Sequence, residues 1–126
     1  MALVLEYNIS QSRLQKLRFA LMKSGLKSRA VKKAEYGQSL GYLAGIEGYE
    51  EIPNADGRDF SDEMLVLCGL SDRQIGVLLP TLRNAGVSVS LKAALTETNA
   101  GWSSSQLREE LIREREAFEK TGESIH

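Results

Sequence analysis

The chain contains two segments, 61 positions apart, with the same order of helix-capping, apolar and glycine residues. These segments are "NISQSRLQKLRFALMKSG", residues 8–25, and "GLSDRQIGVLLPTLRNAG", residues 69–86. The identical pairs are Ser10 with Ser71, Leu17 with Leu78, Leu21 with Leu82, and Gly25 with Gly86. The serine suits a helix N-cap, the leucines mark one helical face, and the glycine suits the left-handed residue that ends a helix. The chain is therefore predicted to fold as two related units, each built around one amphipathic helix.

Short extended segments flank both predicted helices. The runs "ALVLEY" and "MLVLC" precede them, and "LKSRAVKKA" and "VSVSLKAAL" follow. The first run of each unit is almost continuously apolar, as expected for a strand covered on both faces, whereas the second carries interleaved Lys, Arg and Ser. We predict an α/β fold with a four-stranded sheet made of duplicated strand-helix-strand units. The expected strand order is 2-1-3-4, and a C-terminal helix follows.

The direction of the two central strands is not fixed by this pattern. If they are parallel and both crossovers are right-handed, the two helices lie on opposite faces of the sheet. A ferredoxin-like α+β sandwich is the alternative, in which both helices lie on one face. Residues 38–46 and the C-terminal helix would then cover the other face.

Length and charge predict one domain with an acidic connection. The 126 residues are enough to bury a single core. Residues 1–46 carry eight Lys or Arg against two Glu, whereas residues 47–63 hold seven acids and one Arg. We therefore expect a single domain, residues 1–126, with halves 1–46 and 62–126 joined by the acidic loop 47–61. The last helix is predicted to begin after Ser103 and, with its narrow apolar stripe, to project or to pair with a second copy in a homodimer.

Residue counts argue against several chemistries. Cys68 is the only cysteine and His126 the only histidine, so the chain cannot form an internal disulfide or a Cys/His zinc site. A catalytic pair would need a histidine at the last position, where geometry is poorly held. We expect no catalytic residues, no metal and no cofactor. No apolar run approaches the length of a membrane span, and the start lacks a signal peptide, so we expect a cytoplasmic protein with no membrane partner.

The second half resembles a known family. The segment "DEMLVLCGLSDRQIGVLLPTLRNAGVSVSLKAALTETNAGW", followed by a charged helix, is similar to a small bacterial domain of unknown function over residues 62–120. Its "MLVLCG" strand, "LRNAG" helix end and "LKAALTETN" segment carry the likeness. The resemblance implies a bacterial domain and gives no activity.

Two groups of residues are candidates for ligand binding. If the central strands are parallel, a crevice opens beyond their carboxyl ends, and the following helix N-termini favour an anion. Its expected lining is Tyr7, Asn8, Ser10, Cys68, Gly69 and Ser71. The second group lies in the loop before the last helix and consists of Thr96, Thr98, Asn99 and Trp102. Simpler roles compete with these: the serines as helix caps, Cys68 as a core residue, and Trp102 as an apolar contact of the last helix.

We therefore predict a non-enzymatic binding or regulatory module that recognises a small anionic or polar ligand or a protein partner. One alternative is a nucleic-acid-associated protein that uses the basic segment 13–33, with Tyr36 stacking on a base. Its candidate residues are Arg13, Lys16, Lys27, Arg29, Lys32 and Lys33. A second alternative is an enzyme of unrecognised type, centred on Cys68 or on the carboxylates of the acidic loop.

Overall fold

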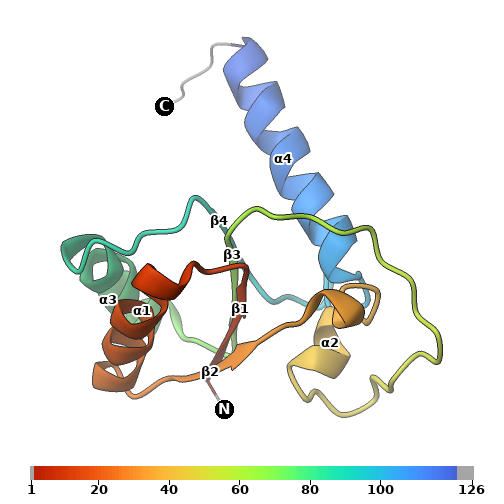
Figure 1. Cartoon of the computed structure of the whole chain (residues 1–126), viewed down its shortest axis with the longest axis horizontal. Coiled ribbons are helices and arrows are strands. Elements are labelled where there is room, and N and C mark those ends of the chain that lie inside the picture. Colours follow the sequence, from red (N-terminus) through yellow and green to blue (C-terminus); the bar gives the residue numbers. More distant parts are fainter. Residues whose placement is uncertain (1, 122–126) are drawn as a thin grey trace.

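The computed structural model describes residues 2–121 as a sheet with helices on both faces and one long projecting helix (Figure 1). In chain order the elements are β1 (Leu3–Tyr7), α1 (Gln11–Lys23), β2 (Lys27–Ala30), the 3₁₀ turn η1 (Lys33–Glu35), α2 (Leu40–Leu43), β3 (Met64–Cys68), α3 (Asp72–Asn84), β4 (Leu91–Ala94) and α4 (Ser104–Thr121). Within the described residues, no helix is long and apolar enough to cross a bilayer.

The four strands form one mixed sheet in the order β2-β1-β3-β4, which confirms the predicted order. β1 pairs with β2 and β3 with β4 in parallel, whereas the central strands β1 and β3 are antiparallel. A parallel central pair, one of the two options that the sequence left open, is therefore wrong. Leu5 faces Val66 across the central pair, and these are the two positions that the offset of 61 makes equivalent.

Both crossover helices lie on the same face of the sheet. α1 and α3 pack side by side over Val4, Leu65 and Leu67, which point to that face (Figure 1). The reason is geometric: right-handed crossovers that leave antiparallel central strands in opposite directions end on one face. The other face is covered by α2 and the base of α4, around a core that includes Leu5 and Tyr7. The helix placement is thus that of the ferredoxin-like alternative, within the predicted strand order.

The two halves follow the same path through equivalent positions. α1 and α3 have 13 residues each, and Asn8 and Gly69, 61 positions apart, both adopt left-handed backbone angles. Beyond the helices the offset is 64, because extra residues precede β4. Ser39 and Ser103, which are 64 positions apart, form an antiparallel bridge. The descent of both halves from one duplicated unit stays a prediction.

The two helices begin differently, although both N-caps are serines. Ser71 and Gln74 form a capping box, with N–O distances of 2.8 and 3.1 Å. Ser10 is the N-cap residue of α1, as predicted, but its side chain makes no hydrogen bond to the helix. Its backbone N–H instead donates to Glu63 Oε2 at 3.3 Å. Arg13, at the position of Gln74, reaches across to the carbonyl of Ser88 at 2.6 Å.

The acidic segment lacks helix and strand but is anchored at two points. Gln38 is buried, and its side-chain amide accepts from Ile52 N at 2.8 Å and donates to Ile52 O at 3.0 Å. Gly37 and Gly57 pass so closely that a Cβ on either would lie within 3 Å of backbone atoms of the other segment. The loop between α2 and β3 is therefore held in place on the side of the molecule away from α1 and α3 (Figure 1).

Candidate functional site

The predicted crevice does not form, because the central strands are antiparallel. Leu3 pairs with Cys68 and Tyr7 with Met64, so the carboxyl ends of β1 and β3 lie at opposite edges of the sheet. Tyr7, Asn8 and Ser10 therefore lie at one edge, and Cys68, Gly69 and Ser71 at the other. The six residues cannot line one site.

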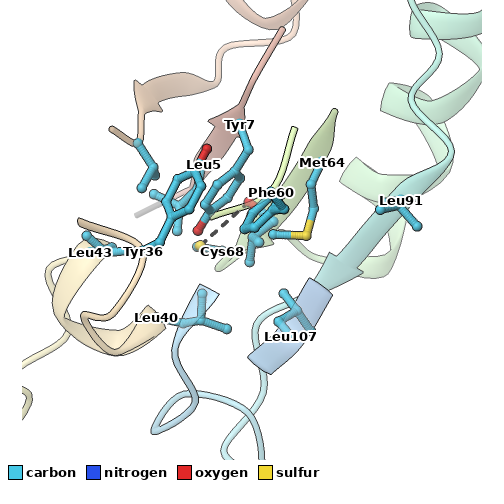
Figure 2. Close-up of a cluster of buried hydrophobic side chains, with 12 residues drawn as sticks. Leu5, Tyr7, Tyr36, Leu40, Leu43, Phe60, Met64, Cys68, Leu91 and Leu107 are labelled. Atoms are coloured by element: carbon cyan, nitrogen blue, oxygen red, sulfur yellow. Dashed lines mark hydrogen bonds between the residues drawn. The ribbon is translucent and has the colours of Figure 1, made fainter. Parts of the chain in front are cut away.

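Tyr7 belongs to a buried aromatic cluster instead of a ligand site (Figure 2). It is fully buried, its hydroxyl lies 2.7 Å from Ser104 Oγ, and desolvation raises its pKa. Tyr36 stacks on Phe60 with ring centroids 4.4 Å apart and donates to Asn8 Oδ1 at 3.0 Å. Since Tyr36 is also fully buried, the prediction that it stacks on a base is wrong.

The polar residues that follow β1 and β3 are used internally. Asn8 adopts a φ of 57° and donates from Nδ2 to the carbonyls of Phe60 and Asp62, both at 3.0 Å. A carboxylate, Glu63, already lies at the N-terminus of α1, and the capping box closes that of α3. These bonds favour the structural interpretation of the capping serines over an anion site.

Cys68 is a buried core residue. Its side chain is 3% exposed and lies 3.7 Å from the carbonyl of Val66. Burial raises the pKa of the thiol to about 12, so the thiolate is scarce at neutral pH. Within the described residues, no three His, Cys, Asp or Glu side chains are grouped to hold a metal. His126 lies outside those residues.

The loop before α4 is stabilised by its own side chains. Asn99 is buried; it accepts from Thr96 N at 2.9 Å, donates from its backbone to Thr96 Oγ1 at 3.1 Å, and donates from Nδ2 to Ala94 O at 3.0 Å. Trp102 packs partly buried against the core, and its carbonyl accepts from Leu40 N at 2.8 Å. Only Thr98, of the four predicted residues, is exposed without such a contact within the described chain.

One cavity joins residues from both predicted groups. It has a volume of about 420 Å³ and lies at the carboxyl ends of the parallel pair β3 and β4. Its lining is Ile46, Tyr49, Gly69, Leu95, Thr96, Glu97 and Ala100. Gly69 and Thr96 were predicted as ligand residues, the former in the crevice and the latter in the loop. The fold brings them together because β3 and β4 are parallel neighbours and end at the same edge.

The segment after α2 forms the wall that the sequence did not predict. The ring of Tyr49 lies against Gly41 so closely that a Cβ there would be 2.5 Å from Cγ of the ring. Gly41 N also donates to the carbonyl of Ala100 at 2.8 Å, which ties α2 to the loop before α4. Ile46 and Tyr49 lie 18 and 15 positions before the start of β3, and no pattern linked them to it. Gly41, a small residue inside the short helix α2, was the only available signal in the sequence that another side chain packs there.

The lining of this cavity is mainly apolar. Ile46, Leu95 and Ala100 give apolar walls, and Tyr49 adds an aromatic ring. Glu97 is the lining residue that carries a charge, and it is exposed. The volume falls in the range of about 300–1,000 Å³ that is typical of small-molecule sites. The lining offers no second carboxylate or cation to share acid-base chemistry with Glu97.

The basic segment is divided between internal contacts and the surface. Arg29 donates to Leu43 O at 2.6 Å and to Glu35 at 2.7 Å, and Lys33 donates to Phe60 O at 2.9 Å. Arg13 donates to Ser88 O and forms an ion pair with Glu63. The other three predicted residues, Lys16, Lys27 and Lys32, are exposed. Half of the predicted nucleic-acid surface is thus engaged in holding the fold together.

Fold and site together define an α/β domain with a mixed sheet and a small, largely apolar cavity at one sheet edge. Residues 63–118, which include β3, α3, β4 and most of α4, contain a domain of unknown function, DUF3783. This match agrees with the resemblance found in the sequence; the bacterial origin stays a prediction. The curated proteins and the solved structures give no significant match to the chain.

Proposed function

We propose that the protein is a non-enzymatic binding module whose ligand occupies the cavity at the ends of β3 and β4. The observation that carries the proposal is the cavity itself, which has a volume of about 420 Å³ and mainly apolar walls. Burial of apolar ligand surface contributes about 25 cal/mol per Å², so such walls favour a ligand with an apolar body. Tyr49 offers a ring face for stacking.

The charge at the cavity indicates the polar end of the ligand. Glu97 places a carboxylate at the lining, and a carboxylate repels an anion in the partly shielded setting of a protein surface. We therefore replace the expected anionic ligand with a neutral or cationic one. A small amine or a neutral heterocycle fits this combination of an apolar wall and one acid.

A thermal-shift screen of small amines, neutral heterocycles and small acids tests this proposal, because a ligand that binds only the native state raises its melting temperature. We expect amines or heterocycles to raise the Tm of the protein and acids to leave it unchanged. Ile46→Trp, which fills the mouth of the cavity, should abolish the shift. The matched control Ile52→Trp changes a similarly exposed isoleucine outside the cavity and should keep it.

Three outcomes would contradict the proposal in whole or in part. A shift that survives in Ile46→Trp would place the ligand elsewhere. Stabilisation by acids alone, retained in Glu97→Gln, would exclude a cation-selective cavity. Turnover of a compound that binds would overturn the prediction that the protein is not an enzyme, while leaving the cavity as the site.

A further inference from the structure

Two exposed surfaces of this chain carry opposite charges that its own ion pairs leave unused. The first, here called the basic face, is the outer side of α1 and α3. Its exposed residues include Lys16, Phe19, Met22, Lys23, Arg73, Val77 and Arg83. Asp72 is the only acid in the two helices, and the exposed Arg18 is paired with Glu6. None of the four cations Lys16, Lys23, Arg73 and Arg83 has an ion-pair partner among the residues that the structure describes, and Lys23 lies over the ring of Phe19 at 5.6 Å.

The basic face is also unusually apolar for a solvated surface. Phe19 is 58% exposed, Met22 65% and Val77 56%. A face that served only to stay in solution would not need large apolar side chains among its charges. Cations mixed with exposed apolar groups are typical of surfaces that dock onto a partner carrying acids and apolar groups of its own.

The second surface, here called the acidic face, is the exposed part of the loop between α2 and β3. Its exposed acids are Glu47, Glu50, Glu51, Asp56 and Asp59. Exposed Ile52 and Arg58 belong to the same loop, and Arg58 is paired with Glu109. Its five acids have no ion-pair partner within residues 2–119, whose side chains are described, whereas Asp62 and Glu63 just beyond them are paired with Arg108 and Arg13. Ile52, in the same loop, is 46% exposed.

The acidic face is presented on a fixed backbone. The bonds of Gln38 to both backbone groups of Ile52 and the close passage of Gly37 and Gly57 hold the loop to the body. A surface that is already ordered loses less conformational entropy on binding, so fixed acids make a better docking site than a mobile acidic tail.

The two faces cannot meet within one molecule. α1 and α3 lie at one end of the long axis in Figure 1, and the loop between α2 and β3 lies at the other. We propose that the basic face of one copy binds the acidic face of a second copy. The charges and the exposed apolar groups are complementary, and the net charge of −1 leaves little overall repulsion between copies. Since one face meets a different one, the association is head-to-tail and extends to short chains or a ring.

Sedimentation velocity over a concentration series tests this proposal on the full chain. At 0.1 M salt, where the Debye length is about 10 Å, we expect the average mass to rise with concentration. At 1 M salt, where it is about 3 Å, the same samples should be monomeric. The double variants K16E/K23E and E50K/E51K should each be monomeric at both salt concentrations. The control K27E/K32E makes the same charge change at exposed lysines outside the basic face and should associate like the parent.

Mixing the two charge-reversed variants gives the decisive measurement. In the mixture, the unchanged acidic face of K16E/K23E can bind the unchanged basic face of E50K/E51K, and the two reversed faces are again opposite in charge. An equimolar mixture should therefore regain the association that both variants have lost. Circular dichroism and the Tm of each variant show that folding is retained, as expected for exposed side chains.

Three results would overturn the proposal. A parent protein that stays monomeric at 0.1 M salt excludes the contact. Association that persists in both variants, or at 1 M salt, places it on another surface such as α4. A monomer whose basic face binds DNA or anionic vesicles in a salt-dependent way has a different partner, and the mixture of variants would then remain monomeric. None of these results depends on the cavity proposed above as the ligand site.

Discussion

A close contact between two glycines fixes the acidic loop to the body of the protein. A Cβ on Gly57 would lie 2.5 Å from Gly37 N and from the carbonyl carbon of Tyr36, both backbone atoms that cannot turn aside. Gly76, in the middle of α3, has nothing within 4 Å of its Cβ position. The same substitution therefore meets opposite surroundings at these two positions.

We predict that Gly57→Ala lowers the free energy of unfolding by about 1–3 kcal/mol, the usual cost of forcing extra atoms into a filled space. Gly76→Ala should instead raise it by about 0.5–1 kcal/mol, because alanine restricts the unfolded chain and favours the helix. Urea denaturation of both variants measures the two changes. An unchanged midpoint for Gly57→Ala would show that the loop yields without cost.

Cys68 gives the folded protein a dependence on alkaline pH. Burial raises the pKa of its thiol from 9.0 to about 12, so the folded state keeps the proton that the unfolded state loses. The stabilising contribution is complete below pH 9 and disappears as the pH rises toward 12. Tyr7 has a raised pKa for the same reason and acts in the same direction.

We predict that stability falls between pH 9 and 12 and that the fall is smaller in Cys68→Ala. Denaturant midpoints measured across this range for both proteins give the comparison. Iodoacetamide at pH 8 should modify Cys68 slowly in the folded protein and rapidly in urea. Fast alkylation of the native protein would contradict the buried thiol and reopen the enzyme alternative.

At the level of single residues, local patterns were predictable and long-range contacts were not. The capping box of Ser71 and Gln74 follows from spacing alone, and so does the core role of Cys68 at the end of an apolar strand. The contact of Glu63 with Ser10 N joins residues 53 positions apart, and no local rule contains it. The same holds for Tyr49 in the cavity wall.

The helices α1 and α3 show how equivalent elements can be stabilised in different ways. Both begin after a serine with an extended backbone, but only the Ser71 side chain accepts a hydrogen bond from its helix. The position three residues on explains the difference. Gln74 returns to its own N-cap, whereas Arg13 extends to Ser88 and Glu63 in the other half of the molecule.

We predict that Ser71→Ala destabilises the protein by about 0.5–2 kcal/mol, the usual cost of losing a helix cap. Ser10→Ala at the equivalent position should change stability by less than about 0.5 kcal/mol, as expected for an exposed residue without such a role. Thermal or urea denaturation of Ser71→Ala and Ser10→Ala measures the two changes in stability. Equal losses would mean that Ser10 caps α1 in solution.

At the level of elements, the sequence predicted what depends on burial and left open what depends on direction. The continuous apolar runs of β1 and β3 place them at the centre, and the mixed composition of β2 places it at an edge. Strand direction leaves no mark on such runs, because a buried strand looks the same in parallel and antiparallel pairs. The predicted crevice required parallel central strands, and it does not form because β1 and β3 are antiparallel.

At the scale of the whole molecule, the first half occupies the place that a second copy of the last half would take. The central pair is centred on Leu5 and Val66, and the bridge between Ser39 and Ser103 also joins equivalent positions. Pairing of equivalent positions is the mark of a twofold relation, as in isologous dimers. The match to a domain of unknown function, over residues 63–118, covers only this last half.

We predict that a fragment of residues 62–121 folds as a homodimer and not as a monomer. Alone, it would leave β3 as an uncovered edge strand with a buried face exposed, a combination that promotes strand pairing. A second copy of β3 can pair with it antiparallel about Val66, as β1 does in the full chain. Sedimentation equilibrium and far-UV circular dichroism over a dilution series should show mass and folded structure lost together. Val66→Lys, at the centre of the pair, should prevent both dimerisation and folding of the fragment. The exposed control Ser90→Lys should prevent neither. A stable, folded monomer of this fragment would show that the last half completes its core without a partner strand.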